Sequence, residues 1–592
     1  MNRFSAAILA ICSVLIVVAQ ERPLPIGLAH EEITRIPGYR DSRAGMERGI
    51  TTPPDQPVRT MAEWEEIQSL AICWAGYDGI LKQIVAAAKT ECEVIIICQN
   101  ENDVISVLQD GTFGGPLPDL DNINFIQAPF NSVWMRDYGA ECIYTNEVDS
   151  LYLLDWIYNR PRPEDDILPD VIGLNKGIGV YNTSTAPNDL VHTGGNFMAD
   201  GAGGAFSSEL VLDENGPDGQ FNQTVKTEAQ VDALMQTWMG ITSARYTKMT
   251  TLPYDGIHHI DMHMKLIDEE TLLVGEFPQG LSDGPQLETN LDAIAANETN
   301  CFGQPYRIVR IPMPSSAGGN FAPDASYRTY ANNVFVNKTV IVPTYRTEYD
   351  TTGLRILRES LPGYRVVGID CDNSGANIIS ASGAIHCITK GIGVADPLLI
   401  RHQKLTDTYE TVNPYPVTAY IRHKSGITSA SLFWSIDTSQ AWNEVVMVDQ
   451  GGNSWNASIP AQAANSTVFY YVGALANNGK TQVRPITAPA GWWKFDVLDI
   501  SNSIFDPQGP AMIDVFPNPC VSHVVITLDH IRKEDVRIVL HDMLGRESLV
   551  LHNGPIAADG RILLDVSALP VGTYSLTVES EFGRATQLLV KR

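Results

Sequence analysis

The stretch VIIICQN, residues 94–100, indicates the fold class of the longer, N-terminal part of the chain. Its run of β-branched residues ends in polar residues, which is typical of a buried strand. VIVPTY, residues 340–345, has the same pattern, whereas residues 81–89 and 231–239 have helical spacing. Strands that alternate with helices from about residue 60 to 395 predict an α/β domain. Because this domain exceeds most single cores, we expect a repeated or radial arrangement.

The pattern changes after Asp396-Pro397. Short alternating strands such as SASLFWSID, residues 429–437, are separated by Gly, Asn and Ser and favour antiparallel sheets. We predict an α/β domain over 44–397, an immunoglobulin-like β-sandwich over 398–502 and a second small all-β domain over 503–592.

The first residues have the features of an export signal. Arg3 precedes an apolar run, Ala6 to Ala19, that is too short to cross a bilayer. We therefore predict a signal peptide over residues 1–20. Residues 21–43 are predicted to be a propeptide, with Arg43-Ala44 as a trimming point.

The composition narrows the function classes. A net charge of −28 argues against nucleic-acid binding, because phosphate backbones select basic surfaces. The nine cysteines, with Cys12 in the predicted signal, are irregularly spaced and too dilute for a disulfide scaffold or a zinc finger. One or two disulfides and a free reactive thiol both stay open.

Two polar clusters interrupt the α/β pattern. WMRDYG, residues 134–139, is explained either by a structural ion pair or by a functional site. In HIDMHMK, residues 259–265, a strand would place His259, Asp261 and His263 on one face. Such a face suits a metal site, a His–Asp acid/base unit or a solvated surface.

The third cluster is SGAIHCITKG, residues 382–391. Its cysteine, Cys387, is a core thiol, a disulfide partner or a nucleophile. A buried inert thiol is the ordinary fate of cysteine. The His–Asp segment and the Asp-bearing segment elsewhere in the chain provide the partners that thiolate chemistry needs, which favours a nucleophile.

Five motifs in order carry a family resemblance: WMRDYG (134–139), HTGGN (192–196), HIDMHMK (259–265), SYRTYANNVFVNKTVIVPTY (326–345) and GAIHCIT (383–389). Together they resemble the agmatine deiminase and bacterial peptidylarginine deiminase branch of the guanidine-modifying superfamily. The resemblance covers roughly residues 60–395. It implies a five-bladed α/β propeller, the pentein fold, with its active site at the centre.

The resemblance also implies the roles of residues. Cys387 becomes the nucleophile, His259 the general acid/base, and Asp137 and Asp261 the carboxylates that hold a guanidinium. Asn333 takes the family's asparagine position, although the adjacent Asn332 leaves the register open. Trp134 is expected to contact substrate. No metal or organic cofactor enters this chemistry.

The last module resembles the C-terminal sorting domain of the type IX secretion system. VFPNPC (515–520), DMLGRE (542–547), LPVGTYSL (569–576) and the basic end Lys591-Arg592 carry this resemblance. It implies the secretion machinery as a partner, attachment to outer-membrane lipopolysaccharide or release, and a secreted or cell-surface location. We expect a monomer.

In WIYNRPR, residues 156–162, two guanidinium groups flank a proline. The resemblance implies that Arg160 and Arg162 grip the C-terminal carboxylate of an arginine-terminated peptide, although a solvated basic loop explains them too. We therefore predict a secreted protein-arginine deiminase that prefers C-terminal arginine. The alternatives are an agmatine deiminase-like hydrolase of small guanidines, an inactive surface adhesin, and a metal-dependent hydrolase that uses His259, Asp261 and His263.

Overall fold

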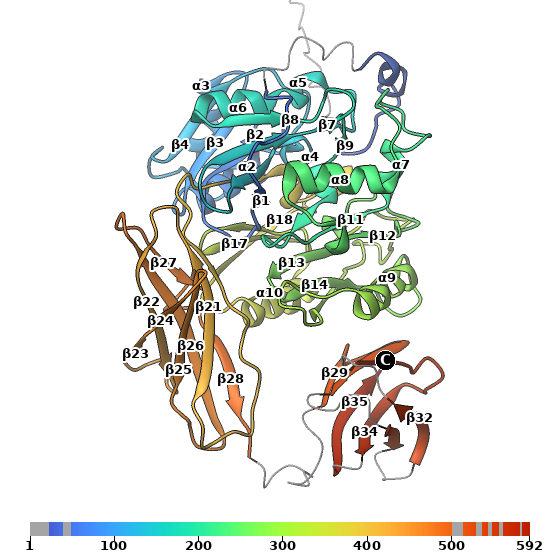
Figure 1. Cartoon of the computed structure of the whole chain (residues 1–592). Helices are drawn as coiled ribbons and strands as arrows, with labels where there is room; N and C mark the ends of the chain where they lie inside the picture. The colour runs from blue at the N-terminus through green and yellow to red at the C-terminus, as the bar shows by residue number, and fades with distance from the viewer. Residues whose placement is uncertain are drawn as a thin grey trace, which may run out of the picture.

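The computed structural model describes residues 23–39, 49–499, 513–528, 535–542, 547–555, 561–580 and 583–592. The predicted signal peptide and the trimming point at Arg43-Ala44 lie outside these residues. Figure 1 shows an α/β body at the top, a β-sandwich along one side of it, and a small all-β unit near the C-terminus. The mixed α/β fold and the additional all-β C-terminal region are therefore confirmed.

The described part of the α/β body contains five sheets of three or four strands each. In hydrogen-bonding order they are β1 (Val58–Thr60), β5 (Glu141–Thr145), β6 (Leu151–Asp155), β8 (Gly179–Asn182); β10 (Met198–Ala199), β11 (Ala205–Ser208), β12 (Tyr246–Met249); β13 (Met264–Asp268), β14 (Thr271–Glu276), β15 (Arg307–Pro312); β16 (Val334–Val336), β17 (Thr339–Thr344), β18 (Arg365–Asp370); and β19 (Lys390–Gly393), β2 (Ile67–Cys73), β3 (Glu93–Cys98), β4 (Ile123–Gln127). β7 (Ile157–Tyr158) and β9 (Val191–His192) form a separate parallel pair.

The five sheets share one connectivity. In each of them an antiparallel pair is followed by a parallel partner, as in β13, β14 and β15. A parallel partner needs a crossover, which helices supply here. These and the remaining helices are α2 (Asp78–Ala88), α3 (Glu101–Gln109), α4 (Met135–Tyr138), α5 (Pro163–Asp166), α6 (Leu168–Lys176), α7 (Leu210–Asn215), α8 (Glu228–Met239), α9 (Gly284–Asn297) and α10 (Thr347–Ser360). The predicted strands at 94–100 and 340–345 correspond to β3 and β17, and the two helical segments to α2 and α8.

The last strand of the body pairs with a strand near its beginning. β19 follows the Cys387 motif and lies antiparallel to β2, more than 300 residues earlier in the chain. β2 and β3, the central strands of this sheet, are buried along most of their length, as expected for strands covered on both faces. This pairing brings the Cys387 segment next to the N-terminal part of the body.

The strand expected over residues 259–265 is wrong. Residues 260–262 form a 3₁₀ helix, η4 (Ile260–Met262), and the strand β13 starts only at Met264. His258 has a left-handed backbone (φ 56°), which turns the chain just before η4. His259, Asp261 and His263 consequently do not share a strand face. Among the described residues, no group of three His, Cys, Asp or Glu side chains is arranged to hold a metal ion.

Residues 399–497 form two facing sheets. One contains β20 (Leu399–Arg401), β21 (Tyr415–Arg422), β25 (Ser454–Ile459) and β24 (Val448–Gly451); the other contains β23 (Asn443–Val446), β22 (Ile427–Ser435), β26 (Ser466–Ala476), β27 (Thr481–Arg484) and β28 (Trp493–Val497). Along β21 buried and more exposed residues alternate, so one face of each sheet packs into a shared apolar core.

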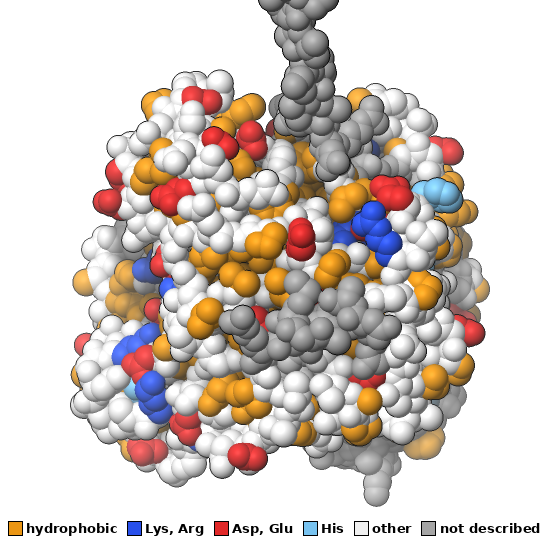
Figure 2. Space-filling view, turned by 90° about the horizontal axis from the view of Figure 1, so that it is seen from above, with side chains coloured by type: hydrophobic (Ala, Val, Ile, Leu, Met, Phe, Trp, Pro, Cys, Tyr) orange, Lys and Arg blue, Asp and Glu red, His pale blue; other side chains and the backbone are white. Residues whose placement is uncertain are grey.

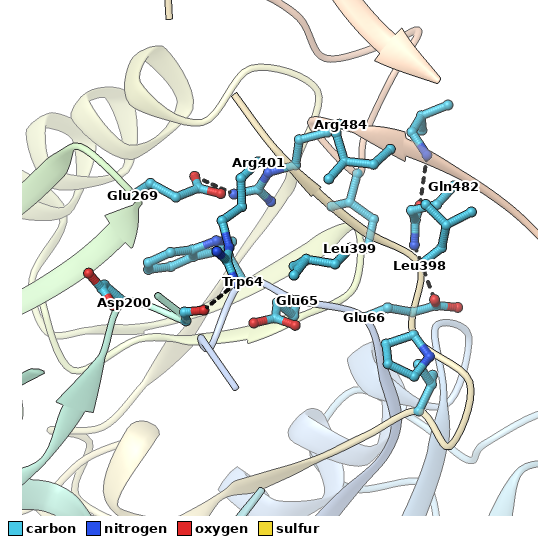
Figure 3. Close-up of a pocket in the computed structure, with 16 residues that line it drawn as sticks. Trp64, Glu65, Glu66, Asp200, Glu269, Leu398, Leu399, Arg401, Gln482 and Arg484 are labelled. Carbon is cyan, nitrogen blue, oxygen red and sulfur yellow. Dashed lines mark hydrogen bonds and ion pairs between the residues drawn. The ribbon is translucent and has the colours of Figure 1, made fainter. Parts of the chain in front are cut away.

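Ion pairs join this sandwich to the α/β body, and in each of them the sandwich segment supplies the cation. They are Arg401–Glu147, Arg422–Glu147, Lys404–Asp268, Lys480–Glu66 and Arg484–Glu269. Figure 3 shows the pocket where the two units meet, with Trp64, Glu269 and Arg484 among its lining residues. Arg484 pairs with Glu269 at 2.8 Å and lies 5.9 Å from the centre of the Trp64 ring.

The C-terminal unit also has two sheets around an apolar core. Its strands are β29 (Ile513–Phe516), β30 (His523–Leu528) and β33 (Arg561–Asp565) in one sheet, and β32 (Glu547–Pro555), β31 (Asp535–Asp542), β34 (Gly572–Ser580) and β35 (Gly583–Lys591) in the other. Among the described residues, no helix has the length and apolar character needed to span a membrane.

Candidate active site

Four one-turn helices meet inside the α/β body: α4, η2 (Gly194–Asn196), η4 and η6 (His386–Ile388). Each immediately precedes a strand of an antiparallel pair, namely β5, β10, β13 and β19. Asn332 stands in the same position before β16. The repeated connectivity therefore brings residues that are up to 250 apart in the sequence to one place.

Glycines allow these turns to approach so closely. A Cβ on Gly195 would lie 2.5 Å from His259 Nδ1 and 2.8 Å from Asp137 Oδ1. A Cβ on Gly383 would lie 2.4 Å from the ring of Trp134 and 3.2 Å from Cys387 Cβ. Real Cβ atoms do not come this close to other atoms, so both motifs require glycine at these positions.

The sulfur of Cys387 lies among polar groups and is fully buried. Asn332 Nδ2 is 3.1 Å from Cys387 Sγ, and Asp261 Oδ2 is 3.6 Å from it. Burial, together with the charges of Asp261 and Asp137, raises the pKa of Cys387 well above its usual value. A cation placed between the sulfur and these carboxylates would oppose this shift and favour the thiolate.

The asparagine that contacts the sulfur is Asn332, not Asn333. Asn332 Oδ1 also accepts a hydrogen bond from the backbone N–H of His386 at 3.0 Å. The amide of Asn333 turns away and donates to the backbone oxygens of Tyr330 and Ala331. The expectation for Asn333 is therefore corrected by one residue. The motif contains two successive asparagines, so the sequence alone could not fix the register.

Asp137 and Asp261 face the same space with unequal surroundings. Burial and the negative charge of Asp261 raise the pKa of Asp137 to about 8, although the charges of Arg160 and Arg162 oppose the rise. Burial acts on Asp261 too, but the hydrogen bond and the charge of His386 lower its pKa. The pair thus holds one proton and one negative charge near neutral pH.

His259 is fully buried beside Asp137, with His259 Nδ1 at 3.5 Å from Asp137 Oδ1. Burial lowers the pKa of His259 to about 3, so its imidazole is neutral. By ordinary hydrogen-bond geometry, neither ring nitrogen of His259, neither oxygen of Asp137 nor Asp261 Oδ1 has a partner among the described residues. Buried polar groups are normally paired, so this cluster is suited to a polar ligand.

His386 connects Asp261 to a further carboxylate, Glu63, that the sequence analysis did not identify. Its Nδ1 lies 2.7 Å from Asp261 Oδ2 and its Nε2 2.9 Å from Glu63 Oε2. Burial alone would raise the pKa of Glu63, but the charges of His386, Lys265 and Arg136 lower it well below its usual value. His386 therefore bridges the carboxylates of Asp261 and Glu63. The position of His386 next to Cys387 in the sequence was the signal that could have identified it as a site residue.

Arg160 and Arg162 are buried beside this cluster rather than solvated, which excludes the basic-loop interpretation. Arg162 binds the carboxylate of Glu32 with two hydrogen bonds, of 2.7 and 3.0 Å. Arg160 Nε donates to the backbone oxygen of Ile26 at 2.9 Å. Trp134 is also buried, and its Nε1 donates to the backbone oxygen of Leu24.

The cysteines of the described residues, Cys387 included, are free. Cys371 is a useful counterpart to Cys387 because it is equally buried, and burial likewise raises its pKa well above its usual value. It contacts the backbone oxygen of Ile369 instead of a polar cluster. The surroundings of the two thiols, rather than their burial, set them apart.

Comparison with known proteins agrees with the motifs. A family model described as "Porphyromonas-type peptidyl-arginine deiminase" matches residues 59–392, and one described as "Secretion system C-terminal sorting domain" matches residues 514–592. A Vibrio parahaemolyticus protein named "Putative agmatine deiminase" is 21% identical over 369 residues, covering 58% of this chain and 98% of that protein.

Solved structures of agmatine deiminases also resemble this chain, at low sequence identity. The Enterococcus faecalis structure has a TM-score of 0.48 and 16% identity, covering 58% of this chain and 99% of that chain. The C. jejuni structure has a TM-score of 0.45 and 21% identity, covering 57% and 96%.

Two conclusions follow from the family models. The sorting domain indicates export through the type IX system to the cell surface or the medium. The larger match spans more than half of the chain and includes every motif from Trp134 to Cys387. The chain belongs to the Porphyromonas-type peptidyl-arginine deiminase family, whose chemistry is the hydrolysis of a C–N bond in a guanidino group.

Proposed function

We propose that this protein is a secreted protein-arginine deiminase that converts peptidyl arginine, preferably C-terminal arginine, to citrulline and ammonia. The observation that carries the proposal is the joint burial of Cys387, His259, Asp137 and Asp261 beside an arginine that binds a carboxylate. A guanidinium is planar and permanently charged, and it matches two carboxylates. The arginine pair matches the other end of the substrate, its free carboxylate.

In the first half-reaction the guanidinium binds between Asp137 and Asp261, and both become ionised. The cation stabilises the Cys387 thiolate, and the thiol proton passes to His259. The sulfur attacks the central guanidine carbon, forming a C–S bond and a tetrahedral adduct. His259 then protonates the departing nitrogen, the C–N bond breaks, and ammonia leaves an S-alkylthiouronium on Cys387.

In the second half-reaction His259, now neutral, removes a proton from water, and the hydroxide attacks the same carbon. The C–S bond breaks, the thiolate is restored and a ureido group is released. Asn332 contacts the sulfur and orients it. His386, held between Asp261 and Glu63, keeps Asp261 ionised and fixes its direction.

The preference for a terminal arginine rests on Arg160 and Arg162. Their charges act on Asp137, which supports a carboxylate clamp near the proposed guanidinium site. The same pair would bind weakly to a substrate without a carboxylate, such as agmatine. Because named relatives are agmatine deiminases, agmatine is the natural competing substrate.

The test compares an arginine-terminated peptide, its C-terminal amide and agmatine, each in the presence of a chelator. We expect ammonia and a ureido product mainly from the free-acid peptide. Arg160→Ala should raise KM for that peptide by about tenfold or more, as expected for a lost charged hydrogen bond, and leave the amide unaffected. Agmatine as the better substrate would refute the peptide specificity, and chelator-sensitive turnover would favour a metal-dependent hydrolase.

We also propose that the five sheets are the blades of a five-bladed α/β propeller. Their shared connectivity and the pairing of β19 with β2, which joins the two ends of the body, support this arrangement. The turns that form the candidate site would then lie on the propeller axis.

A further inference from the structure

The N-terminal segment of residues 23–39 lies against the residues assigned to substrate binding. In Figure 1 this segment, dark blue, lies on the top of the α/β body near α7. Figure 2 shows that face from above, where hydrophobic side chains gather near the centre and Lys and Arg side chains are few. The segment contacts the buried side chains of Trp134, Arg160 and Arg162.

The binding residues hold the backbone of the segment. Trp134 donates to the oxygen of Leu24 at 2.9 Å and Arg160 to that of Ile26 at 2.9 Å. Arg162 Nη2 donates to the oxygens of Pro25 and Gly27 at 2.7 and 3.1 Å. The N–H of Ile26 donates in turn to the oxygen of Ala381, and the Ile26 side chain is fully buried in the core of the body. Backbone contacts of this kind would suit any peptide chain that lay in the same place.

A carboxylate completes the set of contacts. Glu32 and Arg162 are about 98% and 99% buried, and they form a two-point ion pair. Burial alone would raise the pKa of Glu32, but the hydrogen bond and the charge of Arg162 lower it, so Glu32 is ionised. The N–H of Ala29 binds the second oxygen at 2.7 Å. The partners of Glu32 are thus those that a peptide's terminal carboxylate would need.

The segment is held at its far end as well. Ile36 and Tyr39 pack with Ile157, Val191 and Phe221 in a separate apolar cluster. The Tyr39 hydroxyl donates to Asp166, at the end of the helix α5 that follows Arg162. The segment is therefore held both by its contacts with the arginine pair and by the packing of Ile36 and Tyr39.

We propose that residues 23–39 are a built-in competitor for the peptide site, in which Glu32 takes the place of the substrate's terminal carboxylate. This inference rests on the proposed function. Attachment to the same chain gives the competitor an effective concentration in the millimolar range, which a dilute substrate cannot match. Removal of the segment by proteolysis then opens the site, so the unprocessed chain has a higher KM than the processed one.

The test uses the full chain with Glu32→Gln, which keeps the shape of the side chain but removes its charge. Glu31→Gln, at an exposed neighbour, is the matched control. For an arginine-terminated peptide, Glu32→Gln should lower KM by at least about tenfold, the value of a charged hydrogen bond, while Glu31→Gln changes nothing. The same shift should appear in the Kd measured by calorimetry in a Cys387→Ala background, where no turnover takes place.

A second arm keeps Glu32 and cuts the chain after folding. A site for a sequence-specific protease is placed within residues 40–48, the purified protein is cut, and the freed segment is washed away. The rate on arginine-terminated peptide should then rise, and a synthetic peptide of residues 23–39 should restore competitive inhibition. Unchanged KM, Kd and rate in both arms would overturn the inference even if deimination is robust. Peptide binding that tightens as expected, with no deimination of any guanidine, would instead refute the proposed function alone.

Discussion

Guanidinium binding should depend steeply on pH because of Asp137. Its pKa of about 8 arises from burial and from the charge of Asp261. A guanidinium favours the ionised carboxylate, so binding must remove this proton. The affinity should fall about fiftyfold between pH 8 and pH 6, with the slope approaching tenfold per pH unit at the lower end of this range.

Asp165 and Glu214, which interact with the charges of Arg162 and Arg160, have pKa values of about 7, so their contribution has to be separated from that of Asp137. Two other groups near the ligand do not titrate over this range. His259, with a pKa of about 3, stays neutral, and Glu32, with its lowered pKa, stays ionised. The free energy needed to displace the N-terminal segment is therefore the same at every pH in this range. The thiol is removed by using Cys387→Ala. Asp137→Asn in the same background is the control, because its binding should be weaker and any pH dependence that it keeps belongs to the other groups.

The assay is calorimetric titration with an arginine-terminated peptide between pH 6 and pH 9. Repetition in buffers of different ionisation enthalpy counts the protons released, and we expect nearly one per bound peptide at pH 7. A Kd that is flat from pH 6 to pH 8, or no released proton, would refute the assignment of a protonated Asp137 in the free site.

Two further substitutions test the geometry around the sulfur. Glu63→Gln weakens one of the two contacts that orient His386, and kcat should fall about tenfold with little change in KM, as for a lost charged hydrogen bond; a change in KM alone would argue against this positioning role. Gly195→Ala should abolish turnover because its Cβ would lie 2.5 Å from His259 Nδ1, whereas Gly256→Ala, with open space around it, should remain active. Circular dichroism would verify the folding of both, and an active Gly195→Ala enzyme would contradict the geometry.

The sequence predicted the elements that depend on local pattern. The buried strand β3 and the helices α2 and α8 follow directly from apolar periodicity. The segment at residues 259–265 failed because its alternation was read as a strand, whereas the close approach of neighbouring turns imposes a 3₁₀ helix. Periodicity contains no information on such contacts.

The candidate site was predicted only in part, because local motifs can be recognised in a sequence and long-range contacts cannot. Cys387, His259, Asp137 and Asp261 stand in motifs that can be recognised by residue type and order. Glu63 reaches the site through its contact with His386, 323 residues away, and nothing around it in the sequence marks it. The pairing of Glu32 with Arg162, across 130 residues, is equally invisible to a local pattern.

The most direct measurement of the central claim is the mass of the enzyme quenched in acid during turnover of an arginine-terminated peptide. We predict an adduct equal to the peptide minus ammonia on the fragment that contains Cys387, and its loss together with all activity in Cys387→Ala. Cys371→Ala, at an equally buried thiol, should keep both the adduct and the activity. Citrulline formation that persists in Cys387→Ala, or an adduct on another cysteine, would contradict the account.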